Sequence, residues 1–134
     1  MKEVVKFLTE NPVQYLATAG LDGKPRNRPF QYMLEDGGRL YFCTANTKDV
    51  YRELQKNPHV ELTVSSATFA WIRLSGKAVF STDMTIKDKI IEVSPLVKSI
   101  YQTGSNPIFE VFYLSEAKAA IADFSGNPPQ EFIL

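Results

Sequence analysis

The residues best suited to chemistry lie in a short basic segment near the start of the chain. Arg26, Arg28, Phe30 and Tyr32 are spaced two apart, so they share one face if the segment is a strand. Two guanidinium groups followed by two aromatic rings suit a ligand with one anionic end and one flat end. The alternative is a solvated edge strand, because proline, here Pro29, is typical of sheet edges. Spacing alone slightly favours the edge strand.

A second candidate site lies where a predicted strand leads into a predicted helix. Thr44, Thr47 and Lys48 place two hydroxyl groups and a positive charge at this corner. The first turn of a helix presents unpaired N–H groups, which makes such a corner a natural phosphate site. The alternative, and the commoner case, is a helix that begins with Asn46 as its cap and holds no ligand.

The remaining candidates are weaker. Trp71 lies near Arg73 on a predicted strand, but a core or interface aromatic beside a surface arginine explains the pair equally well. The single cysteine, Cys43, excludes an internal disulfide, and the single histidine, His59, excludes a multi-histidine metal site within one chain. No nucleophile elbow or glycine-rich phosphate loop is present. The sequence therefore predicts no metal site and identifies no catalytic residue.

Turn and helix signals divide the chain into short elements. Asp-Gly turns at 22–23 and 36–37 predict hairpins, which are too short for parallel crossovers. Gly76 predicts a bulge. We expect strands over 13–20, 25–34, 39–45, 59–66, 69–81 and from about 108, helices over 2–10, 46–56 and 84–102 (interrupted at Pro95), and a loose tail over 125–129. This predicts one mainly β (α+β) domain over residues 1–134, a small antiparallel barrel of six strands with flanking helices.

Composition limits the classes of partner. The 134 residues carry 15 basic and 15 acidic side chains, and this zero net charge argues against nucleic-acid and membrane-surface binding. Without a signal core or a membrane segment, we expect a cytoplasmic protein. Residues 24–52 nevertheless carry six basic residues against three acidic ones, a local surplus of three.

In order and spacing, these segments resemble the flavin-binding split-barrel family related to pyridoxamine 5′-phosphate oxidase. The ending of the chain is similar to that of small bacterial members related to nitroimidazole resistance. The resemblance runs from about Tyr15 to Ala78 and rests on the motifs Tyr-Leu-Ala-Thr at 15–18, Gly-Lys-Pro-Arg-Asn-Arg-Pro-Phe at 23–30, Gly-Arg-Leu-Tyr-Phe-Cys-Thr at 38–44, Lys48, Asn-Pro-His-Val at 57–60 and Arg-Leu-Ser-Gly-Lys-Ala at 73–78.

The resemblance implies a six-stranded split barrel that forms a homodimer, with one FMN in each of two clefts between the subunits. It implies that the basic strand runs along the flavin and that the strand-to-helix corner holds the phosphate. The cofactor-binding residues that it implies are Arg26, Asn27, Arg28, Pro29, Phe30, Phe42, Cys43, Thr44, Thr47, Lys48 and Trp71.

The function implied is that of an FMN-dependent oxidoreductase, with reduced nicotinamide as the electron donor and a small-molecule substrate that the sequence does not identify. The chain lacks the C-terminal tryptophan- and arginine-containing pattern of pyridoxamine 5′-phosphate oxidases, so we do not expect pyridoxamine phosphate as its substrate. One alternative is a non-catalytic module that binds flavin, deazaflavin or haem, although a single histidine disfavours haem. Another is a structural dimer with an empty cleft.

Overall fold

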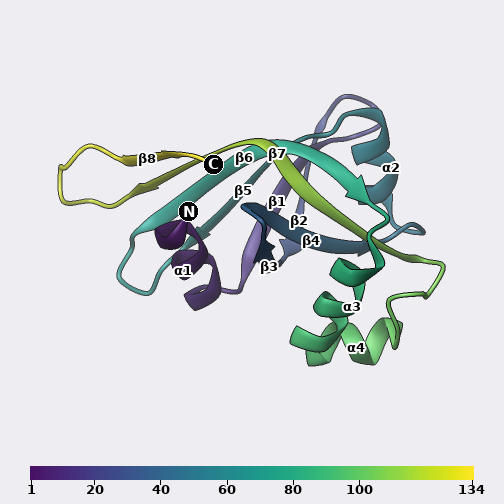
Figure 1. Cartoon of the computed structure of the whole chain (residues 1–134). Coiled ribbons are helices and arrows are strands. Elements are labelled where there is room, and N and C mark those ends of the chain that lie inside the picture. Colours follow the sequence, from purple (N-terminus) through teal and green to yellow (C-terminus); the bar gives the residue numbers. More distant parts are fainter.

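A computed structural model describes residues 1–134 as one antiparallel sheet with four helices (Figure 1). No helix combines the length and the apolar character needed to span a bilayer. The elements in chain order are α1 (Lys2–Glu10), β1 (Gln14–Ala19), β2 (Pro25–Phe30), β3 (Tyr32–Asp36), β4 (Arg39–Ala45), α2 (Asp49–Lys56), β5 (His59–Ser65), β6 (Trp71–Ser81), α3 (Met84–Val93), α4 (Pro95–Tyr101), β7 (Phe109–Ala122) and β8 (Gln130–Ile133).

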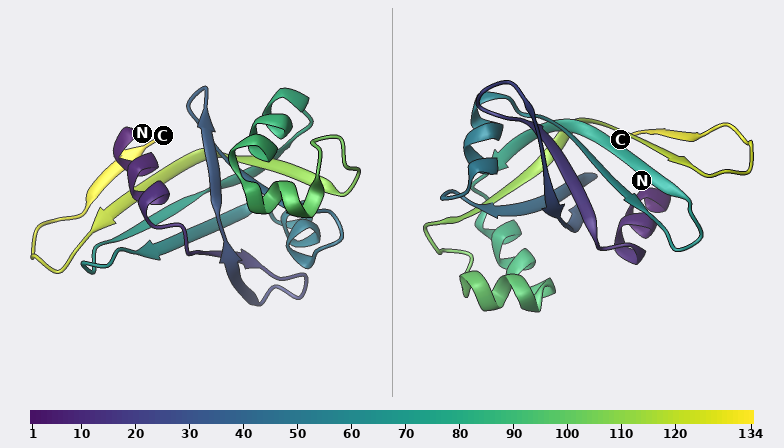
Figure 2. Two further views of the ribbon diagram at one scale, coloured as in Figure 1. Left: turned by 90° about the horizontal axis from the view of Figure 1, so that it is seen from below. Right: turned by 180° about the vertical axis from the view of Figure 1, so that it is seen from behind.

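The sheet is curved and open, with its two edges formed by strands that are neighbours in the chain. The strand order is β2-β1-β5-β6-β7-β4-β3, and β8 pairs with β7 outside this path. Only Gln31 separates β2 from β3, so the chain crosses directly from one edge to the other (Figure 2). All strand pairs are antiparallel. The predicted mainly β, antiparallel fold is confirmed, and it is consistent with a split barrel.

The predicted number of six strands is wrong, because the sheet has eight. The predicted strand over 25–34 divides at Gln31, since β2 pairs with β1 whereas β3 pairs with β4. The predicted loose segment over 125–129 lies outside the strands, and it is followed by the unpredicted β8, whose residues Gln130–Ile133 pair with Lys118–Ile121 of β7. Both differences arise from pairings between distant segments, which no local turn or periodicity signal encodes.

The helix predictions differ from the structure mainly at α2. This helix begins at Asp49 after Lys48, and no side chain caps it. Asn46, the predicted cap, instead donates from its side-chain amide to the Pro107 carbonyl (2.9 Å) and the Glu110 carboxylate (3.1 Å). The corner before α2 is therefore fastened to the start of β7. The predicted interruption at Pro95 is confirmed, since α3 ends at Val93 and α4 begins at Pro95.

Gly76 lies at a bulge between the two longest strands, as predicted. The register of β6 against β7 shifts between Ser75 and Lys77. A Cβ atom at Gly76 would lie 3.0 Å from the Leu114 side chain and 3.1 Å from the Ser115 carbonyl oxygen. Any larger residue would push these strands apart at the bulge.

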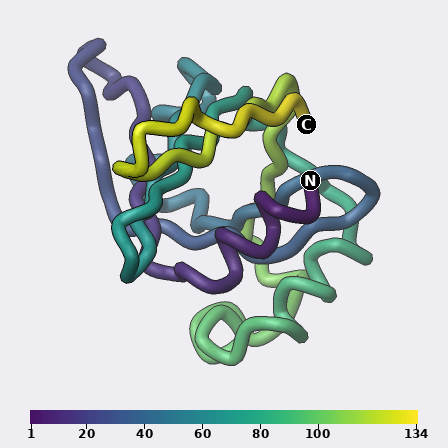
Figure 3. The backbone as a smooth tube through the Cα atoms, turned by 90° about the vertical axis from the view of Figure 1, so that its left-hand side faces the viewer, coloured from purple at the N-terminus to yellow at the C-terminus, as the bar shows by residue number.

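Apolar residues pack on both faces of the sheet. The inner face carries the larger cluster, which includes Phe42 and Phe112 with rings stacked 5.4 Å apart. On the other face, α3 and α4 lie together (Figures 1 and 3) and cover Tyr41, Phe109 and Val111. Neighbouring residues of β4 therefore pack into two different hydrophobic clusters, Phe42 on the inner face and Tyr41 on the face under α3 and α4.

One fully buried polar side chain joins the segments around the open side of the sheet. Gln14 of β1 donates through Nε2 to the carbonyls of Leu8 (2.9 Å) and Asn11 (3.0 Å). Its Oε1 accepts the backbone N–H of Tyr32 at the start of β3 (2.8 Å). The end of α1, strand β1 and the far edge strand β3 thus share one amide group.

We predict that Gln14→Leu lowers the free energy of unfolding by about 2–3 kcal/mol, because three backbone groups lose their partner in a buried place. Chemical denaturation measures the change. Thr9→Ala is the control, since its hydroxyl is exposed and bonds only within α1, and we expect a change of under about 0.5 kcal/mol. A Gln14→Leu variant as stable as the native chain would refute the role of this side chain.

Candidate functional site

The basic strand β2 and the helix α2 lie next to each other at one end of the sheet (Figure 1). The guanidinium of Arg28 on β2 contacts the carboxylate of Glu53 on α2. At the turn between β1 and β2, the carbonyl of Leu21 accepts a hydrogen bond from Lys56 Nζ at 2.6 Å. The structure thus brings the two strongest predicted motifs together at what we call the β2–α2 corner, formed by Pro25–Phe30 and Thr44–Lys56.

Arg28 is held by a buried network at this corner. Its Nη2 donates to Glu53 Oε1 at 2.5 Å, and its Nη1 donates to Thr18 Oγ1 at 2.8 Å and to the Leu16 carbonyl at 3.2 Å. Thr18 Oγ1 in turn donates to Glu53 Oε1 at 2.7 Å. The Glu53 side chain is only 5% exposed and that of Arg28 23%. The positive charge of Arg28 is therefore neutralised within the chain.

The two other arginines of the corner also have carboxylate partners. Arg26 contacts Asp22 at 2.9 Å, and Arg52 contacts Asp49 at 2.5 Å. The pKa of Asp22 is lowered mainly by the Lys24 N–H that bonds its carboxylate, with a further contribution from Arg26. Both arginine pairs are largely exposed, so water and salt screen them and their stabilising effect is small.

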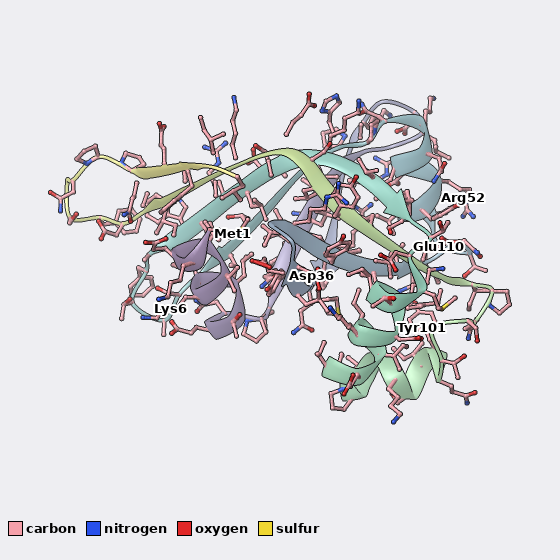
Figure 4. All side chains as sticks on the ribbon, viewed as in Figure 1. Met1, Lys6, Asp36, Arg52, Tyr101 and Glu110 are labelled. Carbon is pink, nitrogen blue, oxygen red and sulfur yellow. The ribbon has the colours of Figure 1, made fainter.

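Lys48 is an exposed cation of the corner that belongs to none of the ion pairs. It directly precedes α2, whose first turn has no side-chain cap, and the exposed Thr47 lies beside it. In Figure 4 the neighbouring Arg52 lies at the same end of the sheet as Glu110, the residue that fastens this corner to β7. An unpaired ammonium beside free helix N–H groups is suited to a phosphate.

Thr44 is the one buried residue whose side chain leaves a hydrogen-bonding group unsatisfied. The residue is 3% exposed, and its Oγ1 has no partner. Buried hydroxyl groups are normally paired, so an orphaned one calls for an explanation such as a ligand or an unseen water. Together, Thr44, Thr47 and Lys48 make a donor set that fits an anionic group such as the phosphate of FMN.

Cys43 and Phe42 belong to the two cores rather than to the open surface of the corner. Phe42 is fully buried, and its ring lies 6.2 Å from that of the half-buried Phe30. Cys43 points to the other face, towards the cluster under α3 and α4. Burial raises the pKa of its thiol to about 12, against the smaller opposing effect of the Lys48 charge. Cys43 is therefore a thiol, not a thiolate, at neutral pH.

Asn27 and Pro29 are exposed on β2, as is Arg26. Phe30 packs inward against Phe42 and Phe112. Of the four residues predicted to share one side of a single strand, Arg28 and Phe30 both point into the molecule, and Arg26 is anchored to the turn through Asp22. Tyr32 belongs to the separate strand β3. Pro29 lies on an edge strand of the sheet, as the solvated-edge interpretation of this segment predicted.

Trp71 is not brought to the corner within one chain. It pairs with Ala122 of β7, whereas Thr44 pairs with Glu110 of the same strand. Twelve residues of strand separate these two positions, from 110 to 122, which corresponds to roughly 40 Å of extended chain. Trp71 lies nearer to β2, because Arg73 pairs with Thr63, which pairs with Tyr15 and through it with Pro29, so that three strand spacings of about 4.8 Å separate the two strands. The Trp71 ring instead packs against Phe124 at 5.0 Å, near the hairpin that projects away from α2 (Figure 1).

Sequence analysis missed Glu53 and Thr18. One signal for Glu53 was available: it lies three residues after Val50 and directly before Leu54, so it shares their buried helix face. A carboxylate on such a face is normally paired. No comparable signal marks Thr18, because its role depends on the contact between β1 and α2.

Three hollows open elsewhere on the surface, with volumes of about 220 to 560 Å³. The largest is lined by seven residues, His59, Val60, Ser75, Gly76, Lys77, Glu116 and Lys118. None of these three hollows is lined by a residue of the β2–α2 corner. The structure also groups no three His, Cys, Asp or Glu side chains that could hold a metal ion.

Comparisons with known proteins agree with this architecture. The family model for pyridoxamine 5′-phosphate oxidase matches residues 1–122. The crystal structure of a NimC/NimA family protein from Clostridium acetobutylicum is 34% identical, with a TM-score of 0.92, and the match covers 100% of this chain and 92% of that one. None of the curated proteins matches the chain.

Two more distant structures share the fold. One is a pyridoxamine 5′-phosphate oxidase-related, FMN-binding protein from Nostoc punctiforme, which is 18% identical with a TM-score of 0.72 over 97% of this chain and 86% of that one. The other is a haem-binding protein from Mycobacterium smegmatis, 18% identical with a TM-score of 0.73 over 93% of this chain and 54% of that one. Both comparisons show that this chain shares its fold with these proteins.

We predict that Cys43 in the folded protein reacts with a disulfide reagent at pH 8 on the order of a thousandfold more slowly than in the unfolded chain, because so little thiolate forms when the pKa is about 12. Absorbance of the released thiol in native buffer and in urea measures both rates. Equal rates would contradict the buried, protonated state of this thiol.

Proposed function

Because this chain belongs to the pyridoxamine 5′-phosphate oxidase family, we propose that it binds FMN and acts as an FMN-dependent oxidoreductase on a small molecule. The observation that carries the proposal is the β2–α2 corner, where a basic edge strand, an uncapped helix start and an orphaned buried hydroxyl meet. When bound, the flavin supplies the electron-transfer chemistry, and the protein supplies binding, orientation and electrostatics.

The phosphate end is assigned to the start of α2. Lys48 offers an uncompensated charge, Thr47 an exposed hydroxyl, and the first turn of the helix its N–H groups. Thr44 lies four residues before Lys48 and has a hydroxyl without a partner. Charge-assisted hydrogen bonds of this kind are shorter and stronger than neutral ones, so they anchor an anion well.

The flat end is assigned to the free edge of β2. This strand pairs with β1 on one side only, so backbone groups on its other side have no strand partner. Such groups can bond the polar edge of a flavin ring, as a further strand would. Asn27 adds an exposed amide on the same strand, whereas Pro29 contributes no N–H.

The functional unit is proposed to be a homodimer with the cofactor between subunits. Residues Val13 and Tyr15 of the β1 region are 68% and 44% exposed, and Tyr15 lies opposite Pro29 and Thr63 on the same face. These two side chains are the apolar part of a face that also carries polar residues such as Thr63. A second chain would cover these side chains, and the partner's Trp71 would supply an aromatic group, whereas the Trp71 ring of the same chain packs against Phe124.

Reduced nicotinamide is the proposed electron donor, bound only transiently, because the chain carries no dinucleotide fingerprint of its own. The acceptor is proposed to be a small molecule.

We predict that the purified protein carries FMN, or takes it up on incubation, and shows the yellow colour and absorption bands of a flavoprotein. Mass spectrometry of the released ligand identifies it, and bleaching by a reduced nicotinamide tests turnover. A protein that stays colourless with added FMN would refute the proposal. A haem spectrum would show that the protein binds haem instead of FMN. If FMN is bound but reduced nicotinamide does not bleach it, the protein would be a non-catalytic flavin-binding module.

We predict that Lys48→Glu weakens FMN binding at least tenfold, because a repulsive charge replaces an attractive one next to the phosphate. Quenching of FMN fluorescence gives the dissociation constant. Lys2→Glu makes the same charge change on the exposed side of α1, and we expect it to leave the dissociation constant within twofold of the native value. Unchanged binding by Lys48→Glu would remove the phosphate from the start of α2.

A further inference from the structure

We propose that the largest of the three hollows is an anion-binding site, separate from the β2–α2 corner, that takes the phosphate or diphosphate group of a small molecule. We call it the bulge hollow, because it surrounds the bulge between β6 and β7. It has a volume of about 560 Å³ and is lined by His59, Val60, Ser75, Gly76, Lys77, Glu116 and Lys118. Since none of these residues belongs to the corner, binding in the bulge hollow does not depend on FMN.

The polar side chains of the bulge hollow have no partner within the chain. His59, Ser75, Lys77, Glu116 and Lys118 form no side-chain hydrogen bond, since only backbone groups of His59 and Lys77 are bonded. None of the five takes part in an ion pair. One imidazole, one hydroxyl and two ammonium groups are therefore free to donate hydrogen bonds to a ligand.

The register of the strands places these donors around one point. Strands β5, β6 and β7 lie side by side in the sheet (Figure 1). His59 pairs with Lys77 across β5 and β6, and Ser75 pairs with Lys118 across β6 and β7. Opposed side chains begin about 5 Å apart and diagonal ones about 7–8 Å apart, which long side chains span. Lys77 and Lys118 can therefore both reach an oxyanion that lies over the Ser75 hydroxyl.

The charge of the lining favours an anion. Lys77 and Lys118 supply two positive charges, whereas Glu116 is the one carboxylate. Val60 is the single apolar side chain, and hollows that bind apolar molecules are lined mainly by apolar groups. Two ammonium groups on one face repel each other, and an anion between them replaces this repulsion by attraction.

The bulge explains why the carboxylate does not neutralise the lysines. Next to the hollow, Arg73 of β6 contacts Glu61 of β5 at 3.1 Å, so charges on this face do pair where the strands are regular. At the bulge, Glu116 and Ala117 of β7 together face Gly76, and the φ of Glu116 is 51°. Bulges re-aim side chains and are frequent beside binding sites. Here the bulge keeps the carboxylate out of an ion pair and leaves the positive charge for a ligand.

The single histidine of the chain makes a direct test possible. In untagged protein, the ring protons of His59 give NMR signals that no other residue shares, so they report on the bulge hollow alone. The protein as purified is titrated with pyrophosphate at constant pH and ionic strength. We expect a saturable shift of the His59 signals with a dissociation constant below about 10 mM. The absence of a saturable shift up to that concentration would overturn the inference.

Charge variants test the lining. Lys77→Gln and Lys118→Gln each remove one ammonium group, and we expect each to raise the dissociation constant of pyrophosphate roughly fivefold. Glu116→Gln removes the opposing carboxylate, and we expect roughly threefold tighter binding. All three side chains are exposed, so the variants should fold, which circular dichroism checks.

The matched controls lie on the helices at the other end of the chain's charge distribution. Lys98→Gln on α4 and Glu92→Gln on α3 make the same charge changes at exposed residues that form no ion pair and line none of the three hollows. We expect dissociation constants within twofold of the native value. A native dissociation constant in either lysine variant of the hollow, or no gain of affinity in Glu116→Gln, would contradict the assigned lining.

A second titration identifies the source of the diphosphate group. Reduced nicotinamide adenine dinucleotide carries a diphosphate within a larger molecule, and only this comparison refers to the proposed function. If it shifts the His59 signals with a lower dissociation constant than pyrophosphate, the hollow takes the diphosphate of a dinucleotide. If pyrophosphate binds more tightly, the ligand is a smaller phosphate compound. If the hollow binds neither while the protein still binds FMN, this inference falls and the proposed function stands.

Discussion

The ion pair between Arg28 and Glu53 is the interaction on which the candidate site depends. It fastens an edge strand to the helix that follows β4, and Thr18 completes it from the neighbouring strand. A buried pair of this kind adds little net stability, because removing both charges from water costs about as much as their attraction returns. Its effect is on placement: it sets β2 beside the start of α2, and it leaves Lys48 as an unpaired cation there.

The second constraint is that the sheet is open, with its two edge strands joined by a single residue. Only Gln31 lies between β2 and β3, yet these strands form opposite edges of the sheet. Gln14 binds the start of β3 to β1 and α1, so the curved sheet keeps its shape without closing by backbone hydrogen bonds. The free edge of β2 that results is the surface to which we assign the flavin ring. The constraint that shapes the fold thus also leaves the binding edge available.

Local signals predicted much of this fold, and contacts between distant segments account for what they missed. The turn at Asp22-Gly23, the break at Pro95 and the bulge at Gly76 each depend on neighbouring residues, and each was placed correctly. The division at Gln31 and the strand β8 depend on which partner each segment finds, so hydrophobic spacing could not show them. On β1, the polar Gln14 and Thr18 face inward while Tyr15 is exposed. For the site, the sequence predicted the two motifs but not the Glu53 carboxylate that joins them.

A structure of the protein with FMN bound tests the central claim most directly, through two distances in the same crystal. The account predicts a phosphate oxygen within about 3.2 Å of Lys48 Nζ, with the guanidinium of Arg28 still bonded to Glu53. A phosphate bound by Arg28 with the Glu53 contact broken, or FMN bound away from the start of α2, would contradict it.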